Sequence, residues 1–378
     1  MKIAHIIPNL RKGGAERLVI DIVRELKKQN NVDVRLVLFR NEIEYEIEDI
    51  INIVKIIPSS VRLSLWRWNN IQVSELQVFF DDFQPDIIHS HLFEAELVTR
   101  SCNYSKAMWY SHAHDNMVQL KKFTINTLSS KKLFVNFFEK RYLLKRYKAN
   151  KGTHFIAISK DTEHYLQETI SNTPIILLNN AINYKRFCTD IKRDIKDDKI
   201  LKLINVGSFV PNKNQQLLLR IAEKLNDKNV NFEIHFLGDG KSKENIKEQS
   251  LTLGLECELI FHGSVDNVEE FLWNSDLYIH VSKSEAFGLT LVEAMAAGLP
   301  VITLDGKGNR DLIEEGKNGY MIYEEDPKLF ADRIIELWND KAKYKEISTY
   351  AQQYAEKYDI KTYTQNLLAI YATALNEN

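Results

Sequence analysis

Two glutamates, Glu285 and Glu293, stand eight residues apart in the stretch Ser-Lys-Ser-Glu-Ala-Phe-Gly-Leu-Thr-Leu-Val-Glu-Ala-Met-Ala, residues 282–296. Glu285 falls in an expected turn, and Glu293 falls in a helical pattern among apolar side chains. Such carboxylates could form an acid–base pair, a metal site, two solvated helix charges or two acceptors for ligand hydroxyl groups. Nothing separates their environments as an acid–base pair requires, whereas a carboxylate among apolar residues needs hydrogen-bond donors. We therefore expect both glutamates to bind ligand hydroxyl groups.

The segment between the two glutamates has the features of a phosphate site. Gly288, Leu289 and Thr290 open the expected helix, where backbone N–H groups lack intrahelical acceptors and the helix dipole is positive. Lys213 opens another expected helix just after a strand, where an ammonium group can pair with phosphate. A lone lysine in such a place is more often a surface residue, so its role depends on its facing the same ligand as the glutamates.

Two histidine pairs, His89-Ser-His91 and His112-Ala-His114, end successive expected strands. Paired imidazoles could ligate zinc or iron. The sequence contains no Asp-x-Asp motif and no carboxylate cluster that would complete a metal set, so we expect no metal. Within each pair we expect one ring to face the core and the other to face a ligand.

Glycines mark two loops. The turn after the first expected strand contains Gly13 and Gly14, which let the backbone approach a ligand at a helix N-terminus. This turn does not match the Gly-x-Gly-x-x-Gly pattern of dinucleotide sites, and a flexible turn is the alternative. Gly306-Lys307-Gly308 imitates part of that pattern, and we expect it to be a loop.

The segment from Lys121 to Lys151 is strongly basic, with Glu139 as its single acid and with aromatic and leucine side chains between the cations. This composition is typical of a basic amphipathic helix that binds an anionic membrane face. An ordinary helix with a solvated basic face is the alternative. A nucleic-acid surface has the same charge, but no nucleic-acid motif accompanies it.

Strand and helix patterns alternate along the whole chain. The expected strands are 2–7, 33–39, 86–89, 107–111, 155–159, 175–178, 201–206, 231–237, 259–261, 277–281, 301–303 and 320–322. The expected helices include 15–28, 74–83, 214–225, 242–253, 289–296 and 327–339. Such alternation predicts an α/β protein with doubly wound parallel sheets, whose ligands bind at the carboxyl ends of the strands. The polar stretch 190–199 separates two such series and is the expected linker.

Length and composition favour two globular domains. The chain has 378 residues, which exceeds one hydrophobic core, and 44% of them are hydrophobic and 27% charged. No apolar run is long enough to span a membrane. Three separated cysteines and the lack of a signal-peptide pattern after Met1 favour a reducing cytosol. The first 180 residues are net basic and the remainder net acidic, which suggests different partners for the two halves.

Taken together, these motifs resemble one family. The stretch from Glu285 to Glu293 is similar to the signature of the retaining nucleotide-sugar glycosyltransferases of GT-B fold, glycosyltransferase family 4 (group 1). Further motifs of that family match residues 13–17, 110–115, 155–159, 179–183, 232–240, 260–265 and 358–375. The segments 212–214 and 304–310 are similar to those of bacterial surface-polysaccharide members. Two positions depart from the family pattern, because Ser208 stands where arginine is common and Ala286 where glycine is usual.

The resemblance implies a GT-B fold, in which two Rossmann-like doubly wound domains face a central cleft. Residues 1–185 would bind the acceptor, residues 186–358 would bind the nucleotide-sugar, and the C-terminal helix 359–378 would cross back onto the first domain. The catalytic residues it implies are His114 and Glu285, with His112 as the alternative histidine. The donor-binding residues it implies are Gly14, Lys213, Val265, Glu285, Ala286, Phe287, Gly288, Leu289, Thr290 and Glu293.

Within that donor site, the resemblance assigns each group a partner. Glu285 and the N–H groups of Phe287 and Gly288 would hold the sugar, and Lys213 with two helix N–H groups would hold the diphosphate. Glu293 would accept hydrogen bonds from the ribose. The backbone at Val265 would contact the base, and Gly14 would lie beside the phosphates or the acceptor.

The implied reaction is retaining transfer of a sugar from a nucleotide diphosphate-sugar, most of all a UDP-sugar. The implied acceptor is a lipid-linked glycan intermediate of bacterial capsule, exopolysaccharide or lipopolysaccharide synthesis. No cofactor or metal would be required. We expect a cytoplasmic protein, peripheral on the inner face of the cell membrane through residues 121–151, with no nucleic-acid partner. The alternatives are a sugar-nucleotide epimerase of the same fold and a degenerate, non-catalytic partner subunit, which Ser208 favours.

Overall fold

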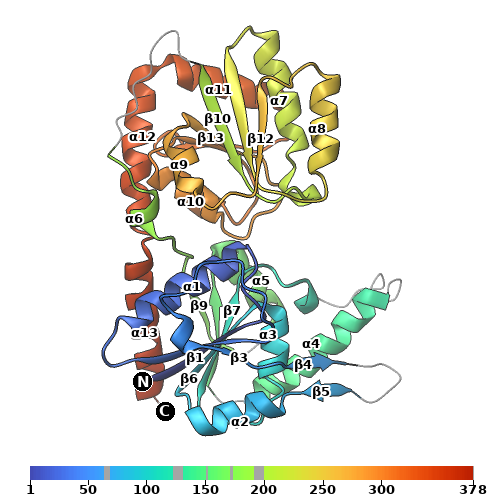
Figure 1. Ribbon diagram of the computed structural model, residues 1–378, viewed down its shortest axis with the longest axis vertical. Helices are drawn as coiled ribbons and strands as arrows, with labels where there is room; N and C mark the ends of the chain where they lie inside the picture. The colour runs from blue at the N-terminus through green and yellow to red at the C-terminus, as the bar shows by residue number, and fades with distance from the viewer. Residues whose placement is uncertain (64–68, 122–130, 150–151, 171–172, 191–199, 378) are drawn as a thin grey trace. The chain divides into compact units, whose positions relative to one another are not determined.

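The chain folds into two compact units, each built on a parallel β-sheet flanked by helices (Figure 1). The computed structural model describes residues 1–63, 69–121, 131–149, 152–170, 173–190 and 200–377. Unit 1 comprises Met1–Ala181 with Ile360–Asn378, and unit 2 comprises Ile182–Asp359. The predicted α/β fold class with two doubly wound sheets is confirmed. The expected linker lies outside the described residues except for Asp190.

Among the described residues, unit 1 holds a seven-stranded sheet in the order β3-β2-β1-β6-β7-β8-β9, with parallel neighbours. Its strands are β1 (Lys2–Ile7), β2 (Asp33–Leu38), β3 (Val54–Ile56), β6 (Ile87–His91), β7 (Met108–Ala113), β8 (Thr153–Ala157) and β9 (Ile175–Leu177). Its helices are α1 (Gly14–Lys27), α2 (Ser74–Phe83), α3 (Leu92–Thr99), α4 (Lys131–Ala149), α5 (Lys160–Thr169) and α13 (Ile360–Asn376). The strands are apolar on both sides because α1 and α13 cover one face and α2 and α3 the other.

A short antiparallel pair, β4 (Ser60–Arg62) and β5 (Asn70–Gln72), adds to the predicted elements of unit 1. These two strands and β3 have three residues each, too few for a recognisable periodicity, whereas the equally short β9 lies in an apolar run and was predicted. The predicted strand ends also shift by up to two residues, and this matters at β6 and β7. Both strands extend far enough to include His91 and His112 within the sheet.

Unit 2 holds, within the described part of the chain, a six-stranded sheet in the order β12-β11-β10-β13-β14-β15. Its strands are β10 (Leu201–Val206), β11 (Phe232–Leu237), β12 (Leu259–Gly263), β13 (Leu277–His280), β14 (Val301–Leu304) and β15 (Gly319–Ile322). Its helices are α6 (Tyr184–Phe187), α7 (Gln216–Asp227), α8 (Lys243–Thr252), α9 (Val268–Trp273), α10 (Leu289–Ala296), α11 (Pro327–Asn339) and α12 (Lys341–Glu356). Its largest core packs α7 and α11 against the central strands.

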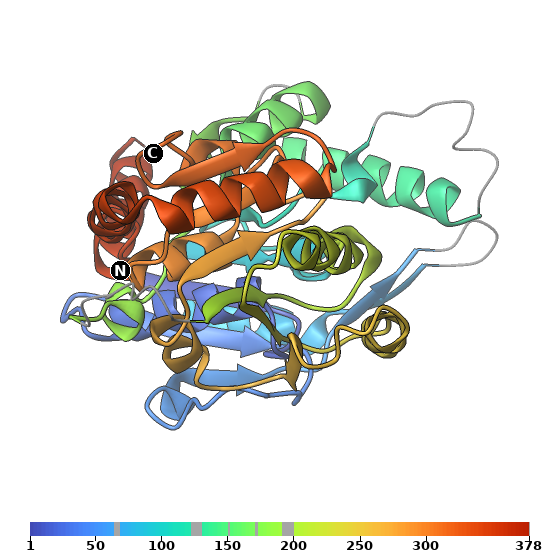
Figure 2. The ribbon, with the colours of Figure 1, turned by 90° about the horizontal axis from the view of Figure 1, so that it is seen from above.

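Helix α4, the described part of the basic segment, projects beyond the sheet of unit 1 (Figures 1 and 2). Leu143 and Tyr147 are buried against the core, whereas Phe138 is exposed. Residues 122–130 and 150–151 of the basic segment lie outside the described residues. None of the described helices has both the length and the apolar composition needed to cross a bilayer.

Candidate functional site

The strand order of unit 2 reverses between β10 and β13, and in doubly wound sheets the loops after two such strands form the ligand site. The loop after β10 carries Lys213, and the loop after β13 carries Glu285. Two hydrogen bonds join these loops: Lys283 N–H donates to Asn212 O at 2.9 Å, and Asn212 Nδ2 donates to Ser284 O at 2.8 Å. The sheet topology therefore brings together the Lys213 and Glu285 segments, which the sequence analysis expected to bind the same ligand.

Glu285 is held by two neighbouring side chains. Lys213 Nζ lies 2.7 Å from Glu285 Oε2, and His280 Nε2 lies 3.0 Å from the same oxygen. Burial by itself would raise the pKa of the Glu285 carboxyl, but hydrogen bonds and charge from His280 and Lys213 outweigh burial and lower the pKa to about 2. Glu285 is therefore ionised at neutral pH. Because both contacts use Oε2, Oε1 is the atom suited to a ligand hydroxyl group.

His280 is a site residue that sequence analysis missed. It is the last residue of β13, it is 1% exposed, and its Nδ1 atom has no hydrogen-bond partner among the described residues. A histidine at the carboxyl end of a central strand, five residues before a candidate carboxylate, is the signal that could have identified it. The fold, and not the spacing, decides that its Nε2 atom reaches Glu285.

The turn from Glu285 into α10 has a fixed backbone shape. Gly288 precedes the helix with a φ of +103°, in the left-handed region that favours glycine. Phe287 beside it is buried, and its ring meets the Tyr358 ring edge-on at a centroid distance of 5.7 Å. The first N–H groups of α10 after this turn, those of Leu289 and Thr290, have no intrahelical acceptors.

Thr290 and Glu293 of α10 lie beside Tyr278 of β13. Thr290 is near the Tyr278 phenol, which donates to Val206 O at 3.3 Å. Burial, with a contribution from the charge of Glu293, raises the pKa of that phenol above its usual range. Glu293 itself is half-buried and comes from the same short helix that supplies the phosphate-type N–H groups. The structure thus brings both candidate glutamates, with their intervening amides, to one edge of the sheet.

The loop 305–310 after β14 packs its backbone against the Glu285 turn. Glu285 N–H donates to Gly306 O at 2.8 Å, and Gly308 N–H donates to Glu285 O at 3.0 Å. A Cβ atom at Gly308 would lie 2.3 Å from the carbonyl oxygens of Glu285 and Ala286, so this position needs glycine. Buried Asn309 closes the loop by accepting the Gly306 N–H. The prediction of a loop at 306–308 is confirmed. The sequence did not indicate that this loop also holds the backbone of Glu285 in place.

Other predicted donor residues follow strands of the same parallel sheet, at its carboxyl edge. Val265 follows β12, and Ala286 is half-buried beside Glu285. Ser208 is exposed on the loop that carries Lys213. The two departures from the family pattern, Ser208 and Ala286, therefore lie on the two loops that form the candidate site.

The sheet of unit 1 reverses its order between β1 and β6, where five imidazole rings gather. His5 of β1 stands opposite His89 of β6, and His91 stands opposite His112 of β7. His5 Nδ1 lies 2.8 Å from His91 Nε2, and His91 Nδ1 lies 3.0 Å from His114 Nε2. Sequence analysis missed His5 because its partners are far away along the chain. We call these five residues the histidine cluster.

The expectation that one histidine of each pair faces the core and the other faces a ligand is wrong. Residues two apart in a strand point to the same side, so each pair stacks. The ring centroids of His89 and His91 are 4.4 Å apart, and those of His112 and His114 are 4.2 Å apart. Four members of the cluster are fully buried, whereas His114, just beyond β7, is half-buried.

Burial keeps the histidine cluster neutral. It lowers the pKa of His5 to about 3 and that of His112 to about 4. Burial, with repulsion from neighbouring imidazoles, also lowers the pKa values of the other three rings well below the usual range. Each neutral ring has one N–H donor and one acceptor nitrogen, which suits the imidazole-to-imidazole hydrogen bonds observed.

The arrangement of rings favours hydrogen bonding over metal binding. The triplets His5–His89–His91 and His91–His112–His114 each have nitrogens within 4.8 Å of one another, close enough to share an ion. However, the stacked pairs are nearly parallel, with interplanar angles of 21° for His89 and His91 and 4° for His112 and His114. Imidazole lone pairs lie in the ring plane, so parallel rings do not direct them at one point. The expected absence of a metal stays a prediction.

The glycine loop of unit 1 lies beside the histidine cluster's strands, after β1. The N–H of Gly13 donates to Tyr45 Oη, and the Tyr45 hydroxyl donates to Gly13 O, both at 2.9 Å. Gly14 begins α1 and is exposed. These two hydrogen bonds argue against the alternative of a flexible turn and leave Gly14 accessible at a helix N-terminus.

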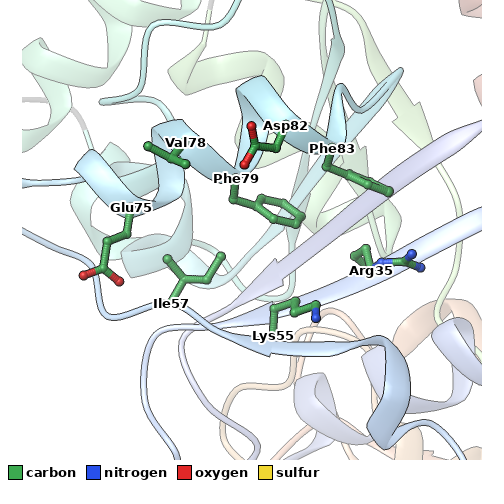
Figure 3. A pocket seen from close by; sticks show the side chains of 8 residues that line it. All are labelled: Arg35, Lys55, Ile57, Glu75, Val78, Phe79, Asp82 and Phe83. Atoms are coloured by element: carbon green, nitrogen blue, oxygen red, sulfur yellow. The ribbon is translucent and has the colours of Figure 1, made fainter.

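A separate pocket of about 520 Å³ lies between α2 and the β2–β3 edge of unit 1 (Figure 3). Its lining combines two cations, two acids, two aromatic rings and two aliphatic side chains: Arg35, Lys55, Ile57, Glu75, Val78, Phe79, Asp82 and Phe83. Arg35 is paired with Asp33, and Lys55 is exposed at the sheet edge. None of the predicted site residues lines this pocket, so we do not assign it to the candidate site.

Comparison with known proteins agrees with this geometry. The model described as Glycosyltransferase Family 4 matches residues 12–186, and the model described as Glycosyl transferases group 1 matches residues 189–354. The chain is 30% identical over 179 residues to N-acetyl-alpha-D-glucosaminyl L-malate synthase of Bacillus anthracis, covering 47% of this chain and 46% of that protein. It is 29% identical over 169 residues to poly(ribitol-phosphate) alpha-N-acetylglucosaminyltransferase of Staphylococcus aureus, covering 44% and 34%. The chain thus spans less than half the length of these curated relatives.

The fold is shared over the whole chain with a solved structure. The crystal structure of Anabaena HepE in complex with UDP-glucose superimposes with a TM-score of 0.77 at 20% identity, covering 99% of this chain and 100% of that one. At this level of identity the likeness establishes the fold.

Proposed function

Since the chain belongs to the group 1 glycosyltransferases of glycosyltransferase family 4, we propose that it transfers a sugar, with retention, from a nucleotide diphosphate-sugar to a glycan acceptor. The observation that carries this proposal is the group formed by Lys213, Glu285 and His280 beside the N-terminus of α10. It places a cation, an ionised carboxylate and helix N–H groups on two joined loops. These are the groups that a diphosphate and a set of sugar hydroxyls require.

The donor would lie along the carboxyl edge of the unit 2 sheet. Lys213 and the N–H groups of Leu289 and Thr290 would bind the diphosphate, and Glu285 would bind the sugar. Glu293 would bind the ribose, one helical turn further on. The remaining donor contacts we propose are those of Gly14, Val265, Ala286, Phe287 and Gly288. Binding of UDP-glucose by HepE, which has this fold, supports UDP as the nucleotide.

In the proposed reaction, the bond between the anomeric carbon and the diphosphate oxygen breaks, and the acceptor oxygen bonds to the same face of that carbon. The acceptor proton passes to the leaving phosphate oxygen, while Lys213 and the α10 N-terminus stabilise the departing charge. Glu285, with a pKa of about 2, is too weak a base to take that proton at neutral pH. Cationic and backbone groups supply the charge stabilisation in this scheme, so it requires no metal.

Unit 1 would provide the acceptor side. His114 is half-buried and neutral, so it can exchange hydrogen bonds with a substrate hydroxyl group. His112 is fully buried, which favours His114 as the catalytic-centre histidine. The Staphylococcus relative, by its name, acts on a poly(ribitol-phosphate), which supports a cell-surface polymer or its lipid-linked precursor as the acceptor class.

Donor binding tests the proposal directly. Calorimetry with UDP, and with UDP-glucose, UDP-galactose and UDP-N-acetylglucosamine, should detect binding, and transfer should persist in a chelator. Glu293→Ala should weaken UDP binding on the order of tenfold, because a ribose-binding carboxylate is lost. Glu336→Ala is the matched control, since Glu336 is 69% exposed on α11 of the same unit. Equal UDP affinity of Glu293→Ala and the wild type would refute the ribose assignment; binding without hydrolysis or transfer would favour a non-catalytic partner subunit.

The basic helix α4 would hold the protein at an anionic membrane face. Arg141, Lys145 and Lys148 are exposed on it, and Phe138 is exposed near its middle. Reversing these three charges to glutamate should release the protein from vesicles that contain anionic lipid, measured by co-sedimentation. Reversal of Lys224 and Lys228 in unit 2 is the control. Unchanged sedimentation of the α4 variant would exclude this surface.

A further inference from the structure

His280 contacts Glu285 from inside the unit 2 sheet. Its Nε2 atom lies 3.0 Å from Glu285 Oε2, and the ring is almost completely buried. Lys213 reaches the same oxygen from the other loop and keeps 27% of its side chain exposed. One partner of Glu285 is therefore built into the core of the strand end, and the other comes from an accessible loop.

The hydrogen bond requires a particular tautomer of His280. A carboxylate only accepts hydrogen bonds, so Nε2 must carry the hydrogen. The contact therefore places a hydrogen on Nε2, while the buried Nδ1 atom has no partner among the described residues. The Nε2–H group donates to Glu285 whatever Lys213 does.

We propose that His280 is a positioning residue that holds Glu285 for recognition of the donor sugar. This inference rests on the proposed function. Lys213 is needed at the diphosphate once a donor binds, so its contact with Glu285 is exchanged at that moment. His280 keeps Oε2 occupied through the exchange, and Oε1 continues to face the sugar hydroxyl groups.

Two further contacts limit how Glu285 can respond if His280 is lost. Its backbone is fixed by Gly306 and Gly308 on either side, so the residue cannot move as a whole. The side chain alone is free to rotate, and without His280 it would follow Lys213. The expected defect is therefore in sugar recognition, with the nucleotide-binding groups of α10 left in place.

Three variants separate this role from a general loss of structure. His280→Leu removes the hydrogen-bond donor of His280 and replaces the ring with an apolar side chain of similar volume. His280→Gln keeps an N–H donor, in the form of a side-chain amide. His235→Leu is the matched control, because His235 Nε2 lies 3.1 Å from Glu233 in the same sheet, away from the site. All would be compared with the wild type for thermal unfolding, for binding of UDP, and for binding and transfer of the best UDP-sugar from the panel above.

We expect His280→Leu to raise the dissociation constant and KM for the UDP-sugar on the order of tenfold, as for loss of a hydrogen bond to a charged group. UDP affinity should stay within about twofold, His280→Gln should recover most of the loss, and His235→Leu should bind the UDP-sugar as the wild type does. If His280 acts through Glu285, His280→Leu should add little to Glu285→Gln in a double-mutant cycle.

The outcomes distinguish failure of the proposed function from failure of the proposed role of His280. A wild type that binds neither UDP nor any UDP-sugar would overturn the proposed function. A wild type that binds both, with an unchanged His280→Leu variant, would overturn the role of His280 alone. Equal losses of UDP and UDP-sugar affinity, or additivity with Glu285→Gln, would show that His280 only supports the fold.

Discussion

Acidification from pH 7.5 to 4.5 should destabilise unit 1 more than unit 2, because the histidine cluster is buried in the neutral form. In the unfolded chain these histidines take up protons as the pH falls through about 6.5. In the folded chain the pKa of His5 is lowered to about 3 and that of His112 to about 4, so both stay neutral to well below pH 6.5. A lowered histidine pKa means that the stabilisation is fully present above pH 6.5 and falls as the pH drops toward the folded-state pKa.

The size of the effect follows from the window between these pKa values. At pH 4.5, two pH units below the unfolded-state pKa, each of the two histidines lowers the free energy of unfolding by about 2.7 kcal/mol. Together they cost about 5 kcal/mol, which is comparable with the whole stability of many domains. His89, His91 and His114 act in the same direction. Asp21 in the same unit acts in the opposite direction, because burial raises its pKa to about 7.

Hydrogen–deuterium exchange resolved by peptide measures the two units separately. Peptides from β1, β6 and β7 should lose protection between pH 6.5 and 4.5, after correction for intrinsic exchange, before peptides from β10 and β13 do. His112→Gln should reduce the pH slope of unit 1 by about 1.4 kcal/mol per pH unit, since one proton fewer is linked to unfolding. His164→Gln, at a position 74% exposed on α5, is the control and should leave the slope unchanged. An unchanged slope in His112→Gln would show that the cluster is hydrated or already protonated.

Three further predictions concern other sites. His114→Ala should reduce transfer at least tenfold while UDP binding stays within about twofold, measured by UDP release and calorimetry; the reverse pattern in His112→Ala would mean that the other histidine is catalytic. Gly308→Ala should weaken UDP-sugar binding on the order of tenfold, since a Cβ 2.3 Å from two carbonyl oxygens must displace the Glu285 turn; wild-type affinity would show that the loop yields without cost. Asp21→Asn should stabilise the protein at pH 8 by up to about 4 kcal/mol, measured by urea unfolding, and the gain should vanish near pH 4. The reason is that burial raises the pKa of the Asp21 carboxyl from 3.8 to about 7, so the wild type loses stability as the pH rises through this range. Destabilisation by Asp21→Asn at pH 8 would mean that the ion pair with Arg24 outweighs burial.

Much of the fold could be predicted from the sequence because its signals are local. Apolar runs of strand length alternate with helical patterns, and this decides an α/β fold with parallel sheets. The phosphate-type turn at Gly288 could also be predicted, since a glycine at the start of a helix marks both the backbone shape and the exposed N–H groups. The three-residue strands β4 and β5 could not, because they carry no usable periodicity.

The histidines show where local reasoning fails. His89-Ser-His91 was recognisable as a pair, but the direction of its rings depends on the exact end of β6. Once the strand extends through His91, both rings must point to the same side and stack. His5 joins them across the sheet, at a separation of more than eighty residues along the chain.

The sequence by itself determined the chemical groups of the candidate site: two carboxylates, a lysine and a glycine-led helix start, all within the segments that follow two strands. Only the tertiary structure decided which of them meet. Placing β13 beside β10 brings Lys213 to Glu285 across 72 residues, and the end of β13 turns His280 onto the same oxygen. Hydrogen bonds depend on distances of about 3 Å, and such distances between remote residues are set by strand order and packing rather than by spacing along the chain.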